Sequence, residues 1–255
     1  MAVKLSARLS QISSYIKAGE SVCDVGTDHG YLPIFLAEQG GHDPLVMSDV
    51  SKGSLNKAVA DAKMVLSDDD LPTARLGDGL DVLSPGEVDD IVIAGMGGIQ
   101  ILDILTWDFA KTLTYGRYIF QPRRDVALLR KWLEVNKFTI IEQCIVPENG
   151  RYSQIICAST EKAERKDIDF YERMTLLEVF SDDPDKLAEY EYPEDIDDPS
   201  GGGVRQAYYT SELNKEQGIL SNIDEGSGNT DTGTALRIHK ARTRRLQVLL
   251  GQQTA

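Results

Sequence analysis

A short loop that combines two carboxylates with two glycines is the first segment able to do chemistry. It runs Asp24-Val25-Gly26-Thr27-Asp28-His29-Gly30 after a short β-rich stretch. Gly26 and Gly30 let the backbone turn tightly and approach a ligand, with a helix opening just after them. The D-x-G-x-x-x-G spacing differs from the G-x-G-x-x-G fingerprint of dinucleotide sites. We expect Asp24, Gly26, Thr27 and Gly30 to bind a cofactor; an ordinary strand-to-helix turn is the alternative.

Two further aspartates stand where an adenosyl group would meet a parallel sheet. Asp49 ends the next β-rich segment and precedes Val50, whereas Asp78 lies between Gly77 and Gly79. A carboxylate after a second strand can accept hydrogen bonds from both ribose hydroxyls. An acid after the third strand often accepts from the adenine amino group. Taken singly, Asp49 could be a helix N-cap and Asp78 a surface turn.

The three segments together predict binding of S-adenosylmethionine. The first loop is close to the D-x-G-x-G-x-G loop of enzymes that use this cofactor, with Asp28 at the middle glycine. Asp49 and Asp78 follow it in the order that cofactor requires. Nothing in this spacing favours a nicotinamide cofactor.

A glycine-rich turn follows a fourth apolar segment. It comprises Ala94, Gly95, Met96 and Gly97, with Gly98 next. Glycines so close to a helix start indicate backbone lying against a ligand or a flat base. We therefore assign the first three residues to the cofactor and Gly97 to the substrate, although Met96 could serve packing alone. Methyltransferases for exocyclic amines often carry Asn/Asp-Pro-Pro-aromatic here; its absence argues against amine methylation.

The elements that would position these residues alternate between strands and helices. Predicted strands cover 21–26, 45–50, 73–77, 88–95, 116–122, 138–147 and 153–159. Predicted helices cover 5–16, 31–39, 54–67, 98–105 and 125–136, with a short helix beginning at Gly79. Such alternation indicates a parallel sheet covered on both faces, and the last two strands add an antiparallel edge. We predict a Rossmann-like class I methyltransferase domain, of the α/β class, over residues 1–160.

The remaining residues, 161–255, differ in kind. Helical patterns cover 167–180, 185–192, 208–222 and 234–251, and residues 193–207 and 224–234 are predicted to be loops. Residues 181–198 are strongly acidic and residues 237–245 strongly basic. We expect a small helical, coiled-coil-like C-terminal domain with acidic and glycine-rich loops.

The motifs resemble those of the TrmK family. DVGTDHGYLP, SDVSKGSL, GDGLDVL, IAGMGG and FQP occur in that family's order and spacing over roughly residues 3–160. The resemblance implies a bacterial tRNA methyltransferase that forms 1-methyladenosine at adenine 22 and uses Asp28 as the catalytic residue. Two positions depart from the family, Arg123 after Gln121-Pro122 where Asn is frequent and Ser153 after Tyr152 where Glu is usual.

A tRNA substrate requires extrusion of the target base and contacts to phosphates. His29 and Tyr31 would lie beside the base, although packing explains each about as well. Predicted substrate contacts further along the chain are Pro122, Arg123 and Arg124, then Arg237, Lys240 and Arg244 in the basic cluster. Further phosphate candidates are Lys4, Arg8, Arg130, Lys131, Arg242 and Arg245. Solvated helix faces are the alternative for every one of these cations.

The overall charge leaves the partner open, because a net charge of −14 repels polyanions while the basic cluster is local. The three cysteines show no metal-ligand spacing and suit reduced, buried thiols. No apolar run is long enough to span a bilayer, and the N-terminus does not resemble a secretion signal. We expect a cytoplasmic monomer without a metal. A small-molecule or other RNA methyltransferase and a non-catalytic binding module remain the competing functions.

Overall fold

The structure is a computed structural model that describes residues 3–165, 180, 182–223 and 230–252. Its strands are β1 (Val22–Val25), β2 (Leu45–Asp49), β3 (Thr73–Leu76), β4 (Asp90–Met96), β5 (Arg117–Pro122), β6 (Thr139–Glu148) and β7 (Arg151–Ser159). Within the described residues they form one sheet in the order β3-β2-β1-β4-β5-β7-β6. Strands β1 to β5 are parallel, and β7 pairs antiparallel with β5 and with β6. The predicted parallel sheet with an antiparallel edge is confirmed.

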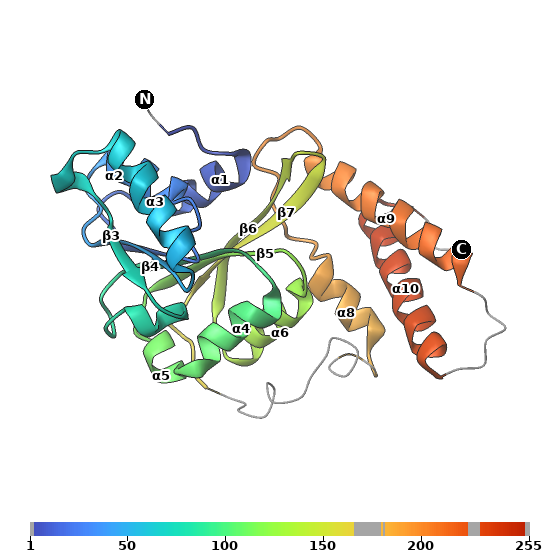
Figure 1. The fold of residues 1–255 in the computed structure, drawn as a ribbon. Helices are drawn as coiled ribbons and strands as arrows, with labels where there is room; N and C mark the ends of the chain where they lie inside the picture. Colours follow the sequence, from blue (N-terminus) through green and yellow to red (C-terminus); the bar gives the residue numbers. More distant parts are fainter. Residues whose placement is uncertain (1–2, 166–179, 181, 224–229, 253–255) are drawn as a thin grey trace.

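Helices cover both faces of this sheet (Figure 1). They are α1 (Ala7–Tyr15), α2 (Tyr31–Gln39), α3 (Lys52–Val65), α4 (Gly98–Trp107), α5 (Phe109–Thr112), α6 (Val126–Val135), α8 (Pro184–Glu191), α9 (Val204–Asn222) and α10 (Thr230–Leu249). Two 3₁₀ turns, η1 (Asp68–Asp70) and η2 (Gly79–Val82), flank β3. Helices α1 to α3 lie on one side of the sheet in Figure 1, and α4 to α6 on the other.

Alternating side chains of β4 explain why both faces need a cover. Ile91 and Ile93 are buried in the core beneath α4 and α6, whereas Val92 is buried in the core beneath α1 and α2. Parallel strands that are apolar on both faces require this two-sided packing. The sheet is therefore rigid at its centre, and the loops at the carboxyl ends of β1 and β4 are held by it.

The strand order reverses between β1 and β4, since β2 and β3 lie on one side of β1 and β4 and β5 on the other. In an open α/β sheet, ligands bind outside the carboxyl ends of the strands at this switch point. The segments that follow β1 at Gly26 and β4 at Gly97 leave the sheet there. The fold thus directs the predicted cofactor residues to one edge.

The C-terminal helices pack against the sheet domain and against one another. Figure 1 shows α9 and α10 side by side beyond the β6–β7 hairpin. Ile145 of β6 is buried in one cluster with Tyr208 and Leu213 of α9 and Leu246 of α10. Leu187 of α8 belongs to the main core. The helical C-terminal part is confirmed, while the domain boundary at residue 160 stays a prediction.

Two predicted loops are partly wrong. Helix α9 begins at Val204, inside the loop predicted for 193–207, because Asp198 Oδ2 accepts a hydrogen bond from Val204 N at 2.6 Å and caps the helix. Helix α10 begins at Thr230, inside the loop predicted for 224–234. The helix predicted for 167–180 falls almost wholly outside the described residues. No described helix combines the length and apolarity needed to cross a membrane.

Candidate active site

Two adjoining cavities open at the carboxyl edge of the sheet, and Gly26 lines both. The first has a volume of about 490 Å³ and lies between the ends of β1 to β4 and helix α4. The second has a volume of about 740 Å³ and lies between the β1–α2 loop, the end of β5 and the β6–β7 turn. A ligand in one cavity can therefore meet a ligand in the other across the β1–α2 loop.

Seven of the predicted cofactor residues line the first cavity: Gly26, Asp49, Val50, Gly77, Asp78, Gly79 and Met96. Four others, Asp24, Thr27, Ala94 and Gly95, line the second cavity instead. Gly30 lines neither, because it is buried at the N-cap of α2 with φ 68°. The sequence thus grouped residues that the structure divides between two neighbouring spaces.

Gly26 fits its position because its left-handed backbone favours glycine and because a Cβ atom there would require the end of the Met96 side chain to move. Its φ is 75°, and a Cβ atom would lie 2.2 Å from Met96 Cε. The amides of Gly26 and Thr27 both donate to the carbonyl of Ser48, at 2.8 and 2.9 Å, which ties the loop to β2. The glycine therefore lets the loop and Met96 come together at the boundary of the two cavities.

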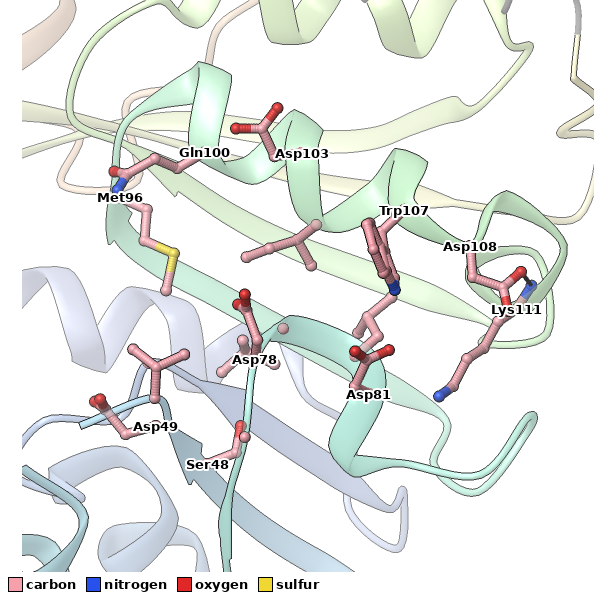
Figure 2. A pocket seen from close by; sticks show the side chains of 17 residues that line it. Ser48, Asp49, Asp78, Asp81, Met96, Gln100, Asp103, Trp107, Asp108 and Lys111 are labelled. Atoms are coloured by element: carbon pink, nitrogen blue, oxygen red, sulfur yellow. Dashed lines mark hydrogen bonds between the residues drawn. The ribbon is translucent and has the colours of Figure 1, made fainter. Parts of the chain in front are cut away.

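Asp49 and Asp78 face the same part of the first cavity, with Met96 opposite (Figure 2). Asp49 is half-buried, and its carboxylate accepts from Ser51 N at 2.7 Å and from Asp28 N at 3.3 Å. Asp78 is exposed. Each carboxylate keeps acceptor capacity for hydroxyl or amino hydrogens of a ligand. Val50, which is 65 % exposed, and Ile104 add apolar surface for a flat ring.

The outer end of the first cavity was not predicted from the sequence. Trp107, at the end of α4, is 79 % exposed, and it lies near Asp81 and Lys111 (Figure 2). A large exposed aromatic side chain at the end of an otherwise apolar helix is the signal that could have found it. Its position depends on how α4 and η2 meet, which no local pattern gives.

Asp28 lines the second cavity, two residues after Gly26, which lines both cavities. Its side chain is exposed, and its φ of 48° is the left-handed conformation that aspartate tolerates better than most residues. Asp28 thus stands at the position of the middle glycine of the D-x-G-x-G-x-G loop and still adopts the left-handed backbone that glycine favours. Its amide is held by Asp49, so the carboxylate that faces the first cavity also positions the residue that faces the second.

His29 and Tyr31 both line the second cavity and stack on one another. Their ring centroids are 5.0 Å apart and the rings are nearly parallel, at 9°. His29 is fixed by Asp61 at Nδ1, 3.3 Å, and by Lys57 at Nε2, 2.8 Å. Tyr31 remains 44 % exposed. The histidine therefore supports the tyrosine ring rather than standing alone in the cavity.

Asp24 is a buried carboxyl group on the wall of the second cavity. Burial raises its pKa to about 6, although a hydrogen bond from Thr27 Oγ1 at 2.7 Å opposes that shift. Removing a carboxylate from water favours its neutral form. The group lies beneath the loop, so it supports the cavity wall from below.

Pro122 and Arg123 also line the second cavity, as predicted for substrate contacts, but Gly97 and Arg124 line neither cavity. A Cβ on Gly97 would lie 2.9 Å from Arg124 Nε, so this arginine packs over the glycine. Arg124 is exposed and pairs with Asp125 at 3.4 Å. Gly97 and Arg124 therefore lie outside both cavities, and their contact with the substrate stays a prediction.

A family model described as a methyltransferase domain matches residues 5–156. The chain belongs to this methyltransferase family. The match covers β1 to β6, the first part of β7 and the residues that line both cavities, so the predicted class I methyltransferase fold is confirmed.

Individual relatives indicate which methyltransferases of this family the chain resembles. This methyltransferase is 31 % identical over 156 residues to a tRNA (adenine(22)-N(1))-methyltransferase of Bacillus subtilis, covering 61 % of this chain and 65 % of that protein. A putative tRNA methyltransferase of Mycoplasma pneumoniae is 30 % identical over 166 residues, covering 63 % and 74 %. The aligned part thus spans less than two thirds of the Bacillus relative.

A solved structure extends the likeness to the whole chain. The B. subtilis M1A22 tRNA methyltransferase TrmK superposes with a TM-score of 0.73 at 26 % identity, over 97 % of this chain and 99 % of that one. The superposition includes the helical C-terminal part. The resemblance to the TrmK family is confirmed.

The basic residues of the methyltransferase do not all face solvent. Arg130 cannot contact phosphates, because it is buried and donates to Gln143, Gln154 and the carbonyl of Tyr190. That prediction is wrong, since helix α6 turns Arg130 inward. Arg8 is half-buried and engages Gln121 and Glu148.

The basic cluster at 237–245 is divided in the same way. Arg237, Lys240 and Arg244 are exposed on α10, and Arg244 pairs with Asp185 at 2.6 Å. Arg242 turns toward Glu191 and Glu216, and Arg245 donates to the carbonyl of Tyr192. The expected phosphate role of Arg242 is wrong because its charge is paired inside the protein, whereas that of the half-buried Arg245 stays a prediction. No group of metal-ligating side chains occurs among the described residues.

Proposed function

We propose that this methyltransferase transfers a methyl group from S-adenosylmethionine to N1 of adenine 22 in tRNA, giving 1-methyladenosine. The observation that carries the proposal is the position of Asp28, exposed in the second cavity and bonded through its amide to Asp49 of the adjoining first cavity. The Bacillus subtilis relative is named for methylation of tRNA at this position, which supports the choice of substrate. We further propose that the protein works in the cytoplasm as a monomer.

The residues of the first cavity suit the adenosyl part of this cofactor. Asp49 would accept hydrogen bonds from the ribose hydroxyls, and Asp78 from the adenine amino group. Val50 and Ile104 would contact the faces of the adenine ring. When bound, S-adenosylmethionine supplies an electrophilic methyl group on its sulfonium. The end of the Met96 side chain lies against the backbone of Gly26, the residue that lines both cavities.

The second cavity would receive the adenine that is methylated. Its N1 atom carries an in-plane lone pair, so no proton has to be removed before the new bond forms. The protein's main task is to align N1 with the methyl group, and a fixed geometry of this kind can lower the barrier substantially. Tyr31, held by His29, offers a ring on which an extruded base can stack.

Asp28 would stabilise the charge that develops on the base. Its carboxylate can accept a hydrogen bond from the N6 amino group, which increases the electron density at N1. Methylation makes the ring cationic, and the adjacent carboxylate stabilises that charge in the transition state. The amide of Asp28 donates to Asp49 at 3.3 Å, so the backbone that carries this carboxylate is positioned before the base arrives.

The test uses unmodified tRNA transcripts with adenine or guanine at position 22. The protein is incubated with S-adenosylmethionine and each transcript, and nucleosides are analysed by mass spectrometry. We expect 1-methyladenosine from the first transcript only. If neither transcript is methylated while the cofactor still binds, the methyltransferase fold stands, the tRNA substrate is wrong, and a small-molecule substrate takes its place.

A further inference from the structure

Two arginines at the mouth of the second cavity form no ion pair with any described residue. Arg123 lies in the loop after β5, and Arg151 is the first residue of β7; both side chains are exposed. Other arginines near the site differ, because Arg8 pairs with Glu148 and Arg124 pairs with Asp125. The guanidinium groups of Arg123 and Arg151 are thus available to an anionic partner.

Both arginines are held by rigid backbone. The amide of Arg123 donates to the carbonyl of Met96 at 2.8 Å, so its loop is tied to the end of β4. Arg151 follows a tight turn in which Asn149 and Gly150 both have positive φ, 51° and 72°. Such a two-residue turn fixes the register of the β6–β7 hairpin. The two side chains therefore start from defined points on different elements.

Glu148 lies directly opposite Arg151 in the hairpin but is already engaged. Its carboxylate accepts from the amide of Arg8 at 3.3 Å and pairs with the guanidinium of Arg8 at 3.5 Å. Burial alone would raise the pKa of Glu148, yet hydrogen bonds from Ser6 and Arg8 hold it below its usual value. The carboxylate thus neutralises Arg8, which leaves Arg151 with its full charge.

The charges inside the cavity are of the opposite sign. Asp24 and Asp28 line its wall, and the third carboxylate there, Glu148, is already paired with Arg8, so it is the two aspartates that disfavour a phosphate in the interior. A neutral base can enter, whereas the phosphates on either side of it must remain at the rim. Arginine is well suited to that rim, because its planar guanidinium binds phosphate oxygens in pairs.

We propose that Arg123 and Arg151 bind the phosphate groups that flank the extruded nucleotide. The proposal rests on the proposed function, since it takes an RNA strand as the partner. It also explains how a chain with a net charge of −14 holds a polyanion, because two of its cations stand unneutralised where the strand must pass.

The experiment measures tRNA binding against salt concentration for Arg123→Gln, Arg151→Gln and the double variant. The probe is the unmodified transcript with adenine 22. Each lost phosphate contact should reduce the slope of log affinity against log salt by about 0.7 to 0.9, and the double variant by about 1.4 to 1.8. The KM for tRNA should rise while kcat at saturating tRNA is retained.

Lys63→Gln is the matched control, because it removes one exposed positive charge at the far end of α3. Its slope should equal that of the unchanged protein. Affinity for S-adenosylhomocysteine and the thermal unfolding temperature, measured for every variant, establish that folding and the cofactor site are intact.

The outcomes separate the two proposals. Unchanged salt slopes in the double variant, with normal methylation of adenine 22 by the unchanged protein, overturn the phosphate role alone. Failure of the unchanged protein to bind or methylate the transcript overturns the proposed function and the phosphate role together. A loss of slope confined to the arginine variants supports the proposal.

Discussion

Asp28 joins two properties that are rarely found in one residue, a left-handed backbone and an exposed carboxylate in the second cavity. The left-handed backbone shapes the β1–α2 loop, and the carboxylate is the group proposed to act in the reaction. Replacement by alanine should therefore lower turnover by about 10²-fold or more, the loss typical of one electrostatic contact to a transition state. Affinity for S-adenosylhomocysteine should stay close to that of the unchanged protein.

Single-turnover kinetics at saturating cofactor and tRNA give the rate, and calorimetry gives the cofactor affinity. Asp28→Asn serves as the companion variant, because its amide oxygen still accepts a hydrogen bond but carries no charge. An intermediate rate for this variant is expected. Unchanged turnover in Asp28→Ala would remove the residue from the mechanism.

Asp24 makes a pH-dependent contribution to stability. Burial raises its pKa to about 6 from an ordinary value of 3.8, so the folded state binds this proton more tightly than the unfolded state. Between about pH 4 and pH 6 the folded protein holds the extra proton, and its stability falls as the pH rises through that window. The shift corresponds to roughly 3 kcal/mol lost above pH 6.

Asp24→Asn removes this titration while an amide oxygen remains to accept from Thr27 Oγ1. The variant should therefore gain stability relative to the unchanged protein as the pH is raised from 4 to 7. Urea denaturation at several pH values measures the difference in unfolding free energy. A difference that does not vary with pH would contradict the assignment of this titration to Asp24.

The site residues that could be predicted from the sequence are those with a local signal. Asp49 and Asp78 were found because each follows a strand and neighbours the residue types of a turn. Trp107 and Arg151 were not found, because their roles depend on which loops meet at the cavity mouths. The division of Asp24 and Asp49 between two cavities likewise depends on the path of the β1–α2 loop.

Arg130 links three elements through a buried hydrogen-bond network. Its guanidinium donates to Gln143 of β6 at 3.1 Å, to Gln154 of β7 at 2.6 Å and to the carbonyl of Tyr190 in α8 at 2.7 Å. Gln143 then donates to Asp195 and Gln154 to Tyr208. The network joins the antiparallel edge of the sheet to α8 and α9. Burial lowers the pKa of Arg130 to about 10, which still leaves it charged near neutral pH.

Arg130→Met should destabilise the protein by about 3–5 kcal/mol, because its three acceptors would remain buried without a donor. Lys131→Met is the matched control on the same helix. Lys131 is partly exposed and pairs with Glu134 at 3.4 Å, so its loss should cost less than about 1 kcal/mol. Chemical denaturation gives both values, and equal losses would show that the network adds no stability.

Among the helices and strands, the sequence was most informative for the strands of the sheet and least informative for the C-terminal helices. Apolar, β-branched segments such as Ile91–Ile93 carry a strong local signal for a buried strand, so the limits of the strands were predicted closely. The start of α9 depends instead on Asp198, which caps it from six residues before Val204. Composition marks that stretch as a loop, and only the folded chain reveals the cap. Arg130 was assigned to solvent because a charged residue on a helix usually faces it.

The whole molecule divides its charge between folding and binding. Glu191 and Glu216 are acidic residues of the C-terminal helices, and both lie against Arg242 of α10. His239 also pairs with Glu216 at 2.5 Å. These contacts join α8, α9 and α10 into one unit against the β6–β7 hairpin. Positive charge on the inner face of α10 is therefore used within the protein, and only the outer face can meet a polyanion.

The two faces of α10 should respond differently to loss of charge. Arg242→Gln leaves Glu191 and Glu216 without their shared cation, so it should destabilise the protein by about 3 kcal/mol or more. It should leave the salt dependence of tRNA binding unchanged at temperatures where the variant is folded. The double variant Arg237→Gln/Lys240→Gln changes exposed residues, so stability should be nearly unaffected.

For the double variant Arg237→Gln/Lys240→Gln, the slope of log tRNA affinity against log salt concentration should fall by up to about 1.4 to 1.8, since each phosphate contact contributes about 0.7 to 0.9. Denaturation curves and binding at several salt concentrations provide the two readouts for both variants. If the double variant binds tRNA with an unchanged slope, the outer face of α10 takes no part in RNA binding. The cavity mouth at Arg123 and Arg151 would then be the principal phosphate-binding surface, because the inner cations of α10 are already paired.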